Sequence, residues 1–162
     1  MDMACGALRL GQFLIPYLHR GHYIGVDVTR TLIDAGLEHE LSPGIVKMKK
    51  PQFIINDSFD LSDCPPFDMA VAQSLFTHLT LDDIERCGRG LRAAARPGSV
   101  FLFTWFEGEG TTNPEGPSHA NRSWWYPYEA VAERLAAGGW APDRLGNWNH
   151  PRNQMLGSAT AV

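Results

Sequence analysis

The sequence lacks several features that would assign it to a class of protein at once. No apolar run approaches the ~20 residues that cross a bilayer, and no basic segment followed by a long apolar one opens the chain. Its cysteines, Cys5, Cys64 and Cys87, are scattered, without a CxxC pair or a Cys/His cluster. We therefore expect free thiols in a reducing cytoplasm, no disulfide framework, no metal site and no membrane partner.

Positive charge is scarce as well. The 162 residues carry 14 Lys and Arg against 18 Asp and Glu, a formal net charge of −4, without a long run of either sign. Binding to a nucleic acid therefore has no electrostatic support, and no basic patch is expected. The length suits one domain with its own core, so we expect a single domain over residues 1–162.

Short apolar stretches alternate with segments of helical periodicity, which predicts an open α/β sheet of mostly parallel strands. We expect a linker at 42–51 and a long loop at 107–123, and loops of that length are usually functional. The tail predicts two strands around a turn near 149–153. The other expected strands are 1–4, 22–27, 52–57, 67–74 and 99–106, and the expected helices are 8–19, 31–41, 81–95 and 127–137.

The carboxyl ends of parallel strands gather on one edge of such a sheet, where ligands bind. Four features of the sequence follow strand ends: the small-residue turn after Ala4, then Asp27, Asp57 and the pair Gln73-Ser74. We expect them on the same edge.

The turn "ACGALRLG" is the first candidate for a binding loop. Gly6 and Gly11 have the spacing of a P-loop, but Gln12 and Phe13 stand where Lys and Ser or Thr must follow. The dinucleotide fingerprint G-x-G-x-x-G is also incomplete, which disfavours an oxidoreductase or other nucleotide binder. A small-residue turn with acids at two strand ends suits a nucleoside without a diphosphate, because carboxylates accept hydrogen bonds from ribose hydroxyls. S-adenosylmethionine is such a molecule.

Five segments in order resemble the class I S-adenosylmethionine-dependent methyltransferases, in particular the small bacterial ones. They are "DMACGALRLG", "YIGVD", "INDSFDL", "FDMAVAQSLFTHL" and "LRAAARPGSVFLFTWF". The resemblance covers nearly the whole chain. It implies a Rossmann-like, doubly wound sheet with a C-terminal antiparallel hairpin, and methyl transfer to a small-molecule acceptor. Relative to this family, we expect the first strand to be incomplete and the N-terminal helix to be missing.

The resemblance also implies which residues bind S-adenosylmethionine. The family's first and last motif glycines are replaced here by Ala4 and Leu8, and Leu8 needs more room than glycine. The implied contacts are Asp2, Ala4, Cys5 and Gly6 along the methionine part, Asp27 and Val28 at the ribose, Asp57, Ser58 and Phe59 at the adenine, and Gln73 near the methionine.

The residues that act on the acceptor are harder to identify from the sequence. The methyl group of a sulfonium is already activated, so the protein has mainly to align it with the acceptor. His78 is the candidate general base near neutral pH, or alternatively a histidine bonded to local backbone. His119 is either a lid residue beside the acceptor or a solvated side chain. Aromatic residues flank the long loop and either wall an acceptor pocket or belong to the core; Trp105, Trp124 and Tyr126 are the candidates.

Two further hypotheses stay open from the sequence. One is a non-catalytic domain that binds S-adenosylmethionine or serves as a scaffold, and the other is a nucleotide-binding oxidoreductase. Neither the acceptor nor the oligomeric state follows from the sequence.

Overall fold

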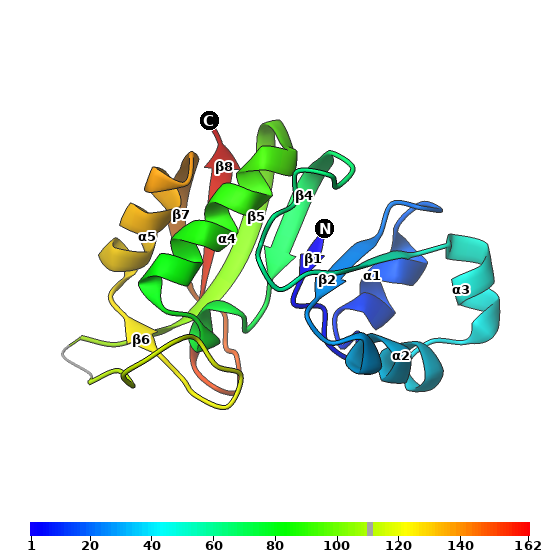
Figure 1. Cartoon of the computed structure of the whole chain (residues 1–162), viewed down its shortest axis with the longest axis horizontal. Helices are drawn as coiled ribbons and strands as arrows, with labels where there is room; N and C mark the ends of the chain where they lie inside the picture. Colours follow the sequence, from blue (N-terminus) through cyan, green and yellow to red (C-terminus); the bar gives the residue numbers. More distant parts are fainter. Residues whose placement is uncertain (110–111) are drawn as a thin grey trace. The chain divides into compact units, whose positions relative to one another are not determined.

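The computed structural model describes residues 1–109 and 112–162. The chain divides into two compact units, unit 1 (Met1–Ser58) and unit 2 (Phe59–Val162). Each unit has its own strands and helices (Figure 1). The single domain expected over residues 1–162 stays a prediction.

Unit 1 contains three short parallel strands with β2 in the middle. The strands are β1 (Asp2–Met3), β2 (Ile24–Asp27) and β3 (Gln52–Ile55). All four residues of β2 are buried, as a central parallel strand requires. Met3 pairs with Val26, and Asp27 pairs with Ile55, so the carboxyl ends of the three strands meet at one edge.

Three helices accompany this sheet: α1 (Gly11–Tyr17), α2 (Arg30–His39) and α3 (Pro43–Lys49). The linker expected at 42–51 is wrong, because α3 occupies most of it. The Ser42 hydroxyl accepts a hydrogen bond from the Ile45 N–H, and Pro43 fits the first helical position. The core of unit 1 gathers around these elements and consists of Cys5, Leu8, Ile15, Tyr23, Ile33 and Leu41.

Unit 2 has a mixed sheet in the order β4-β5-β8-β7, with β6 paired to β5. Strands β4, β5 and β6 are parallel, whereas β8 runs antiparallel to both β5 and β7. The C-terminal hairpin expected from the sequence is therefore confirmed. The strands are β4 (Phe67–Ala72), β5 (Ala95–Glu107), β6 (Trp125–Tyr126), β7 (Trp140–Asn147) and β8 (Gln154–Ala161).

Helices α4 (Leu81–Ala94) and α5 (Tyr128–Ala137) lie side by side over one face of this sheet (Figure 1). The short helix η1 (Phe76–His78) follows β4. The indole N–H of Trp140 donates to the Gly88 carbonyl of α4 at 2.8 Å, which fixes the helix on the strand. Fully buried side chains between helices and sheet include Ile84, Leu91, Phe101, Phe103, Val131 and Leu135.

The elements of the chain agree with the mostly parallel α/β arrangement expected from strand–helix alternation. Some strand ends differ: β3 stops at Ile55 and β4 at Ala72, each two residues short of the expected end. Within the described residues, no helix is both long enough and apolar enough to cross a membrane.

Candidate functional site

The loop between β1 and α1 passes three times through the left-handed region of backbone conformation. Ala4 has a φ of 56°, Gly6 of 50° and Leu8 of 59°. Only glycine adopts this region without a steric penalty. By the resemblance these are the three glycine positions of the family's motif, and the backbone takes a conformation that glycine favours at all three although Ala4 and Leu8 are not glycines.

Leu8 obtains the room it needs from two glycines. Its side chain is fully buried in the core of unit 1. A Cβ on Gly36 of α2 would lie 2.6 Å from the Ala7 backbone and 2.7 Å from Leu8 Cγ, and one on Gly11 would lie 3.1 Å from Leu8 Cβ. The absence of these two side chains lets α2 and the start of α1 close around the loop.

Asp27 connects the loop to the end of β2. Its Oδ2 accepts a hydrogen bond from the Gly6 N–H at 2.8 Å, and its Oδ1 accepts one from the Thr29 N–H at 2.9 Å. The residue is 8% exposed. The carboxylate thus holds the loop after β1 and the start of α2 in a fixed geometry at the carboxyl edge of the sheet.

Asp57 lies just past the neighbouring strand. The Asn56 N–H donates to the Asp27 carbonyl at 3.0 Å, which holds the segment after β3 beside the end of β2. Asp57 and Ser58 are exposed there, and Val28 is 63% exposed beside Asp27. Unit 1 therefore brings Gly6, Asp27 and Asp57 to one edge, as expected from the sequence.

Asp2 and Cys5 point into the interior of unit 1. Asp2 is 3% exposed, and its Oδ2 accepts a hydrogen bond from the Tyr23 hydroxyl at 2.6 Å. Burial raises the pKa of Asp2 from 3.8 to about 6, although this hydrogen bond opposes the shift. Burial also raises the pKa of the Cys5 thiol. Both side chains lie on the interior side of the loop. Their contacts with a cofactor stay predictions.

Unit 2 contains a buried polar network of which the sequence indicated only Ser74. Ser74 follows Gln73 at the end of β4, and its N–H donates to Thr104 Oγ1 at 2.7 Å. The Thr104 hydroxyl donates to Gln154 Oε1 at 2.7 Å, and the Gln154 amide also contacts the Ser74 hydroxyl. Gln154 is fully buried. This network joins β4, β5 and β8 and fixes the backbone beside the half-buried Gln73.

His78 is half-buried and tied to the long loop. Its Nδ1 lies 2.6 Å from the Arg122 carbonyl, and its own carbonyl accepts from the His119 N–H at 3.2 Å. A carbonyl only accepts hydrogen bonds, so Nδ1 carries a proton and Nε2 keeps its lone pair in the neutral ring. The exposed His119 accepts from the Asn121 N–H through its Nδ1.

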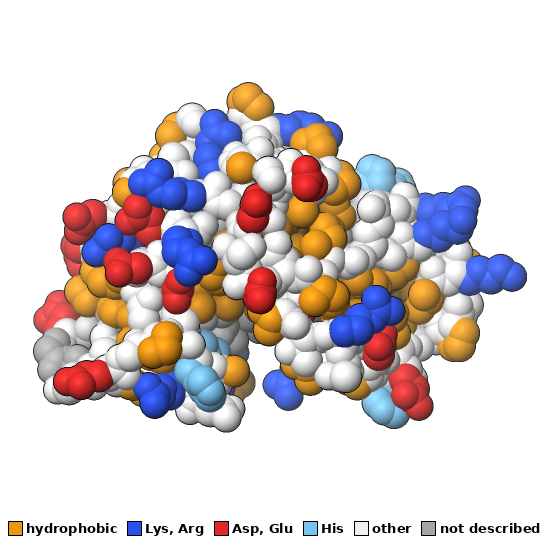
Figure 2. All heavy atoms as spheres, viewed as in Figure 1, with side chains coloured by type: hydrophobic (Ala, Val, Ile, Leu, Met, Phe, Trp, Pro, Cys, Tyr) orange, Lys and Arg blue, Asp and Glu red, His pale blue; other side chains and the backbone are white. Residues whose placement is uncertain are grey.

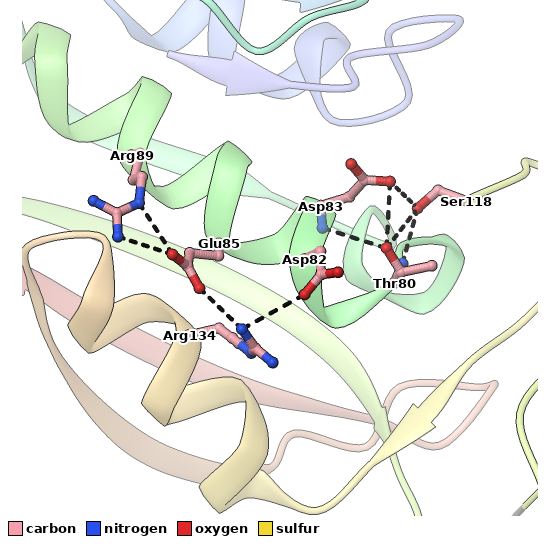
Figure 3. A network of polar contacts seen from close by, with 7 residues as sticks. All are labelled: Thr80, Asp82, Asp83, Glu85, Arg89, Ser118 and Arg134. Atoms are coloured by element: carbon pink, nitrogen blue, oxygen red, sulfur yellow. Dashed lines mark hydrogen bonds and ion pairs between the residues drawn. The ribbon is translucent and has the colours of Figure 1, made fainter. Parts of the chain in front are cut away.

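Ser118 ties the long loop to the start of α4 (Figure 3). Its hydroxyl donates to Asp83 Oδ2 at 2.5 Å and accepts from the Thr80 N–H at 2.8 Å. Thr80 in turn caps α4 by accepting from the Asp83 N–H. The same view shows Arg134 of α5 reaching Glu85 of α4 at 3.1 Å. The two bonds of Ser118 fix the described loop segment that carries His119.

The aromatic candidates lie in the interior of unit 2. Trp105 is fully buried, while Trp124 is 2% and Tyr126 is 7% exposed. The backbone N–H of Trp124 donates to the Thr77 carbonyl, and the Tyr126 side-chain hydroxyl donates to the Leu79 carbonyl, so both residues hold the end of the long loop against the segment 77–79. Their role at an acceptor stays a prediction.

Phe59 is the remaining expected contact, and it belongs to unit 2. It is half-buried with a φ of 60°, and its backbone packs against α4. A Cβ on Gly90 would lie 1.8 Å from the Phe59 carbonyl oxygen, so only glycine fits at that point of α4.

Comparison with known proteins assigns the chain to a family. A sequence model described as "Methyltransferase domain" matches residues 1–101. No curated protein matches the sequence.

Several solved structures share the fold. The magnesium protoporphyrin IX methyltransferase of Synechocystis, crystallised with bound S-adenosylmethionine, has a TM-score of 0.73 and 14% identity, over 99% of this chain and 68% of that one. An S-adenosylmethionine-dependent methyltransferase from Clostridium acetobutylicum has a TM-score of 0.74 and 14% identity, over 99% and 82%. The sugar N-methyltransferase KedS8 of Streptoalloteichus has a TM-score of 0.68 and 18% identity, over 99% and 78%.

At these sequence identities the solved structures show a shared fold only. The family model matches more than half of the chain and therefore shows the family. The chain belongs to the methyltransferase domain family, and its fold is the Rossmann-like fold of the class I S-adenosylmethionine-dependent methyltransferases.

Proposed function

We propose that this chain transfers the methyl group of S-adenosylmethionine to a small-molecule acceptor, and that unit 1 holds the adenosyl and methionine parts of the cosubstrate. The observation that carries the proposal is the hydrogen bond between the Gly6 N–H and Asp27 Oδ2, at 2.8 Å. It unites the glycine turn and the strand-end acid in one place. S-adenosylmethionine supplies a methyl group that its sulfonium already activates. The protein therefore has mainly to bind the cosubstrate, align it with the acceptor and exclude water.

The residues of unit 1 fit an adenosyl group. Apart from its chain neighbours, a Cβ at Gly6 would have no atom closer than the Ala4 carbonyl oxygen, at 4.0 Å, so the loop is open above Gly6. Ala4 is exposed on the same loop. The backbone of this loop can therefore come close to the methionine part of the cosubstrate, which carries no diphosphate.

Asp27 has acceptor capacity left for a ribose. Its two backbone hydrogen bonds use one lone pair on each oxygen, and an ionised carboxylate offers about four. The remaining lone pairs accept hydrogen bonds from the two ribose hydroxyls. Asp57 and Ser58 stand exposed at the next strand end, where the exocyclic amine of an adenine can donate to a carboxylate or a carbonyl.

His78 is the proposed general base for an acceptor whose hydroxyl or amine must lose a proton. The bond from Nδ1 to the Arg122 carbonyl orients the ring and leaves Nε2 to take the proton. The choice of a small molecule rests on similar folds that act on a porphyrin and on a sugar.

Product formation tests the proposal. The chain is incubated with S-adenosylmethionine and a panel of small acceptors bearing hydroxyl, amine or carboxylate groups, and S-adenosylhomocysteine is quantified. We expect acceptor-dependent release by the wild type. His78→Asn keeps an N–H that can donate to the Arg122 carbonyl but removes Nε2, so kcat on a hydroxyl or amine acceptor should fall by about 10²-fold or more. Binding of S-adenosylhomocysteine without turnover of any acceptor would instead favour the non-catalytic hypothesis.

A further inference from the structure

A groove in unit 1 is lined mostly by Lys and Arg side chains, which corrects the expectation that the chain has no basic patch. Its walls come from the segment after α1 and from the end of α3, and they consist of His19, Arg20, Lys47, Met48, Lys49 and Lys50. All three lysines of the chain are among them. The rest of the positive charge in the sequence is arginine, so the patch is a local concentration in a chain of net charge −4.

The two walls are held side by side by specific hydrogen bonds. The Gly21 N–H donates to the Lys49 carbonyl at 2.7 Å, and Lys49 Nζ donates to the Leu18 carbonyl at 2.7 Å. The side chain of Gln52 donates to the Gly21 carbonyl at 3.0 Å. The groove is therefore a defined feature of the fold, and its shape does not depend on exposed side chains alone.

Most of the Lys and Arg side chains in the groove have no counter-charge. Among residues 1–109 and 112–162, no carboxylate forms an ion pair with Arg20, Lys47 or Lys50. Figure 2 shows blue side chains over the end of α3 without a red one beside them. Lys47 and Lys49 also complement the carboxyl end of α3, but that does not account for Arg20 and His19, which come from another segment.

Lys50 stands where a lysine is unfavourable for the backbone. Lys50 directly follows the last residue of α3 and has a φ of 50°. Glycine is the preferred residue in this conformation at helix ends. A side chain there costs about 1 kcal/mol. The position therefore retains a cation at the expense of stability.

We propose that this groove binds a ligand carrying phosphate groups. Several unpaired cations facing one groove match a multiply charged anion, and a guanidinium with ammonium groups is the usual donor set for phosphate. The groove lies before β2 and β3, at the opposite end of these strands from Asp27 and Asp57. It is thus separate from the proposed cosubstrate site and does not depend on it.

Isothermal titration with inorganic pyrophosphate tests the proposal on the full chain. We expect binding by the wild type, weakened about tenfold or more in Arg20→Gln. Lys50→Gly should weaken binding similarly while raising the unfolding temperature, so that loss of binding cannot be ascribed to unfolding. Arg96→Gln, which makes the same charge change in unit 2, should bind as the wild type does.

Two further arms separate the sources of phosphate. Sedimentation with phosphatidylglycerol vesicles, compared with phosphatidylcholine vesicles, tests a lipid headgroup, and binding lost in Lys50→Gly would assign that source. Pyrophosphate binding without vesicle binding would assign a soluble phosphate ester. Equal affinity for citrate and pyrophosphate, equal affinity among all variants, or no binding in either arm would overturn the proposal.

Discussion

The backbone N–H of Gly6 lies 2.8 Å from Oδ2 of Asp27, 21 residues further along the chain. The other oxygen of the same carboxylate accepts from the Thr29 N–H. One side chain therefore fixes both the loop after β1 and the turn after β2. These two hydrogen bonds help to hold a loop in which Ala4 and Leu8 adopt positive φ without being glycines.

Ala4→Gly should stabilise the protein, since Ala4 is exposed and has a φ of 56°. Relief of the left-handed penalty predicts a gain of about 1 kcal/mol in the free energy of unfolding. Ala7→Gly is the matched control, because Ala7 is not at positive φ, and it should cost about 0.5–1 kcal/mol. Urea unfolding of both variants measures the difference, and changes of the same sign would show that the loop is not strained at Ala4.

Gly36→Ala should destabilise unit 1 and disturb the loop. The new Cβ would lie 2.6 Å from the Ala7 backbone, and such overpacking costs about 1–3 kcal/mol. Gly44→Ala in α3 places the same methyl group where no atom lies within 4 Å, and should be neutral or stabilise by up to about 1 kcal/mol. Thermal unfolding of the pair provides the measurement, and a tolerated Gly36→Ala would contradict the close contact between α2 and the loop.

The Asp2 carboxyl should make stability depend on pH. Its folded pKa of about 6 exceeds the ordinary 3.8, so the folded chain binds more protons than the unfolded chain between these values. The contribution is complete below about pH 4 and is lost as the pH rises through about 6, which amounts to about 3 kcal/mol.

Asp2→Asn removes this titration, so the free energy of unfolding of the variant minus that of the wild type should rise by about 2 kcal/mol from pH 4 to 7. Other titrating groups cancel in the difference. Parallel pH profiles for the two proteins would show that Asp2 titrates normally.

The sequence predicted the elements whose signals are local. The helix at 81–95 was marked by Thr80 at its start, and the C-terminal hairpin by its turn residues; both are confirmed as α4, β7 and β8. Helix α3 was missed because the proline and glycine of "SPGIVKMKKP" were interpreted as a linker, although Ser42-Pro43 is also a helix start. The carboxyl ends of β3 and β4 were predicted two residues too far, because the polar residues that follow them, Asn56-Asp57 and Gln73-Ser74, were counted with the strands.

Interactions between distant segments could not be predicted from the sequence. The bond between Ser118 and Asp83 joins residues 35 positions apart, and the contacts of Ser74 with Thr104 and Gln154 join three strands. The groove between residues 19–20 and 47–50 also arises only when the two segments meet in space. By contrast, Gly6, Asp27 and Asp57 could be placed together, because parallel strands always bring their carboxyl ends to one edge.

Titration calorimetry with S-adenosylhomocysteine tests most directly whether Asp27 and the Gly6 loop form the cosubstrate site. The wild type should bind, and Asp27→Ala should lose about ten- to a hundredfold in affinity, as expected for removal of hydrogen bonds to a charged acceptor. Asp34→Ala removes an exposed acid of α2 that is paired with Arg30 and should leave the affinity unchanged. Absence of binding by the folded wild type, or equal affinity in the wild type and Asp27→Ala, would contradict the account.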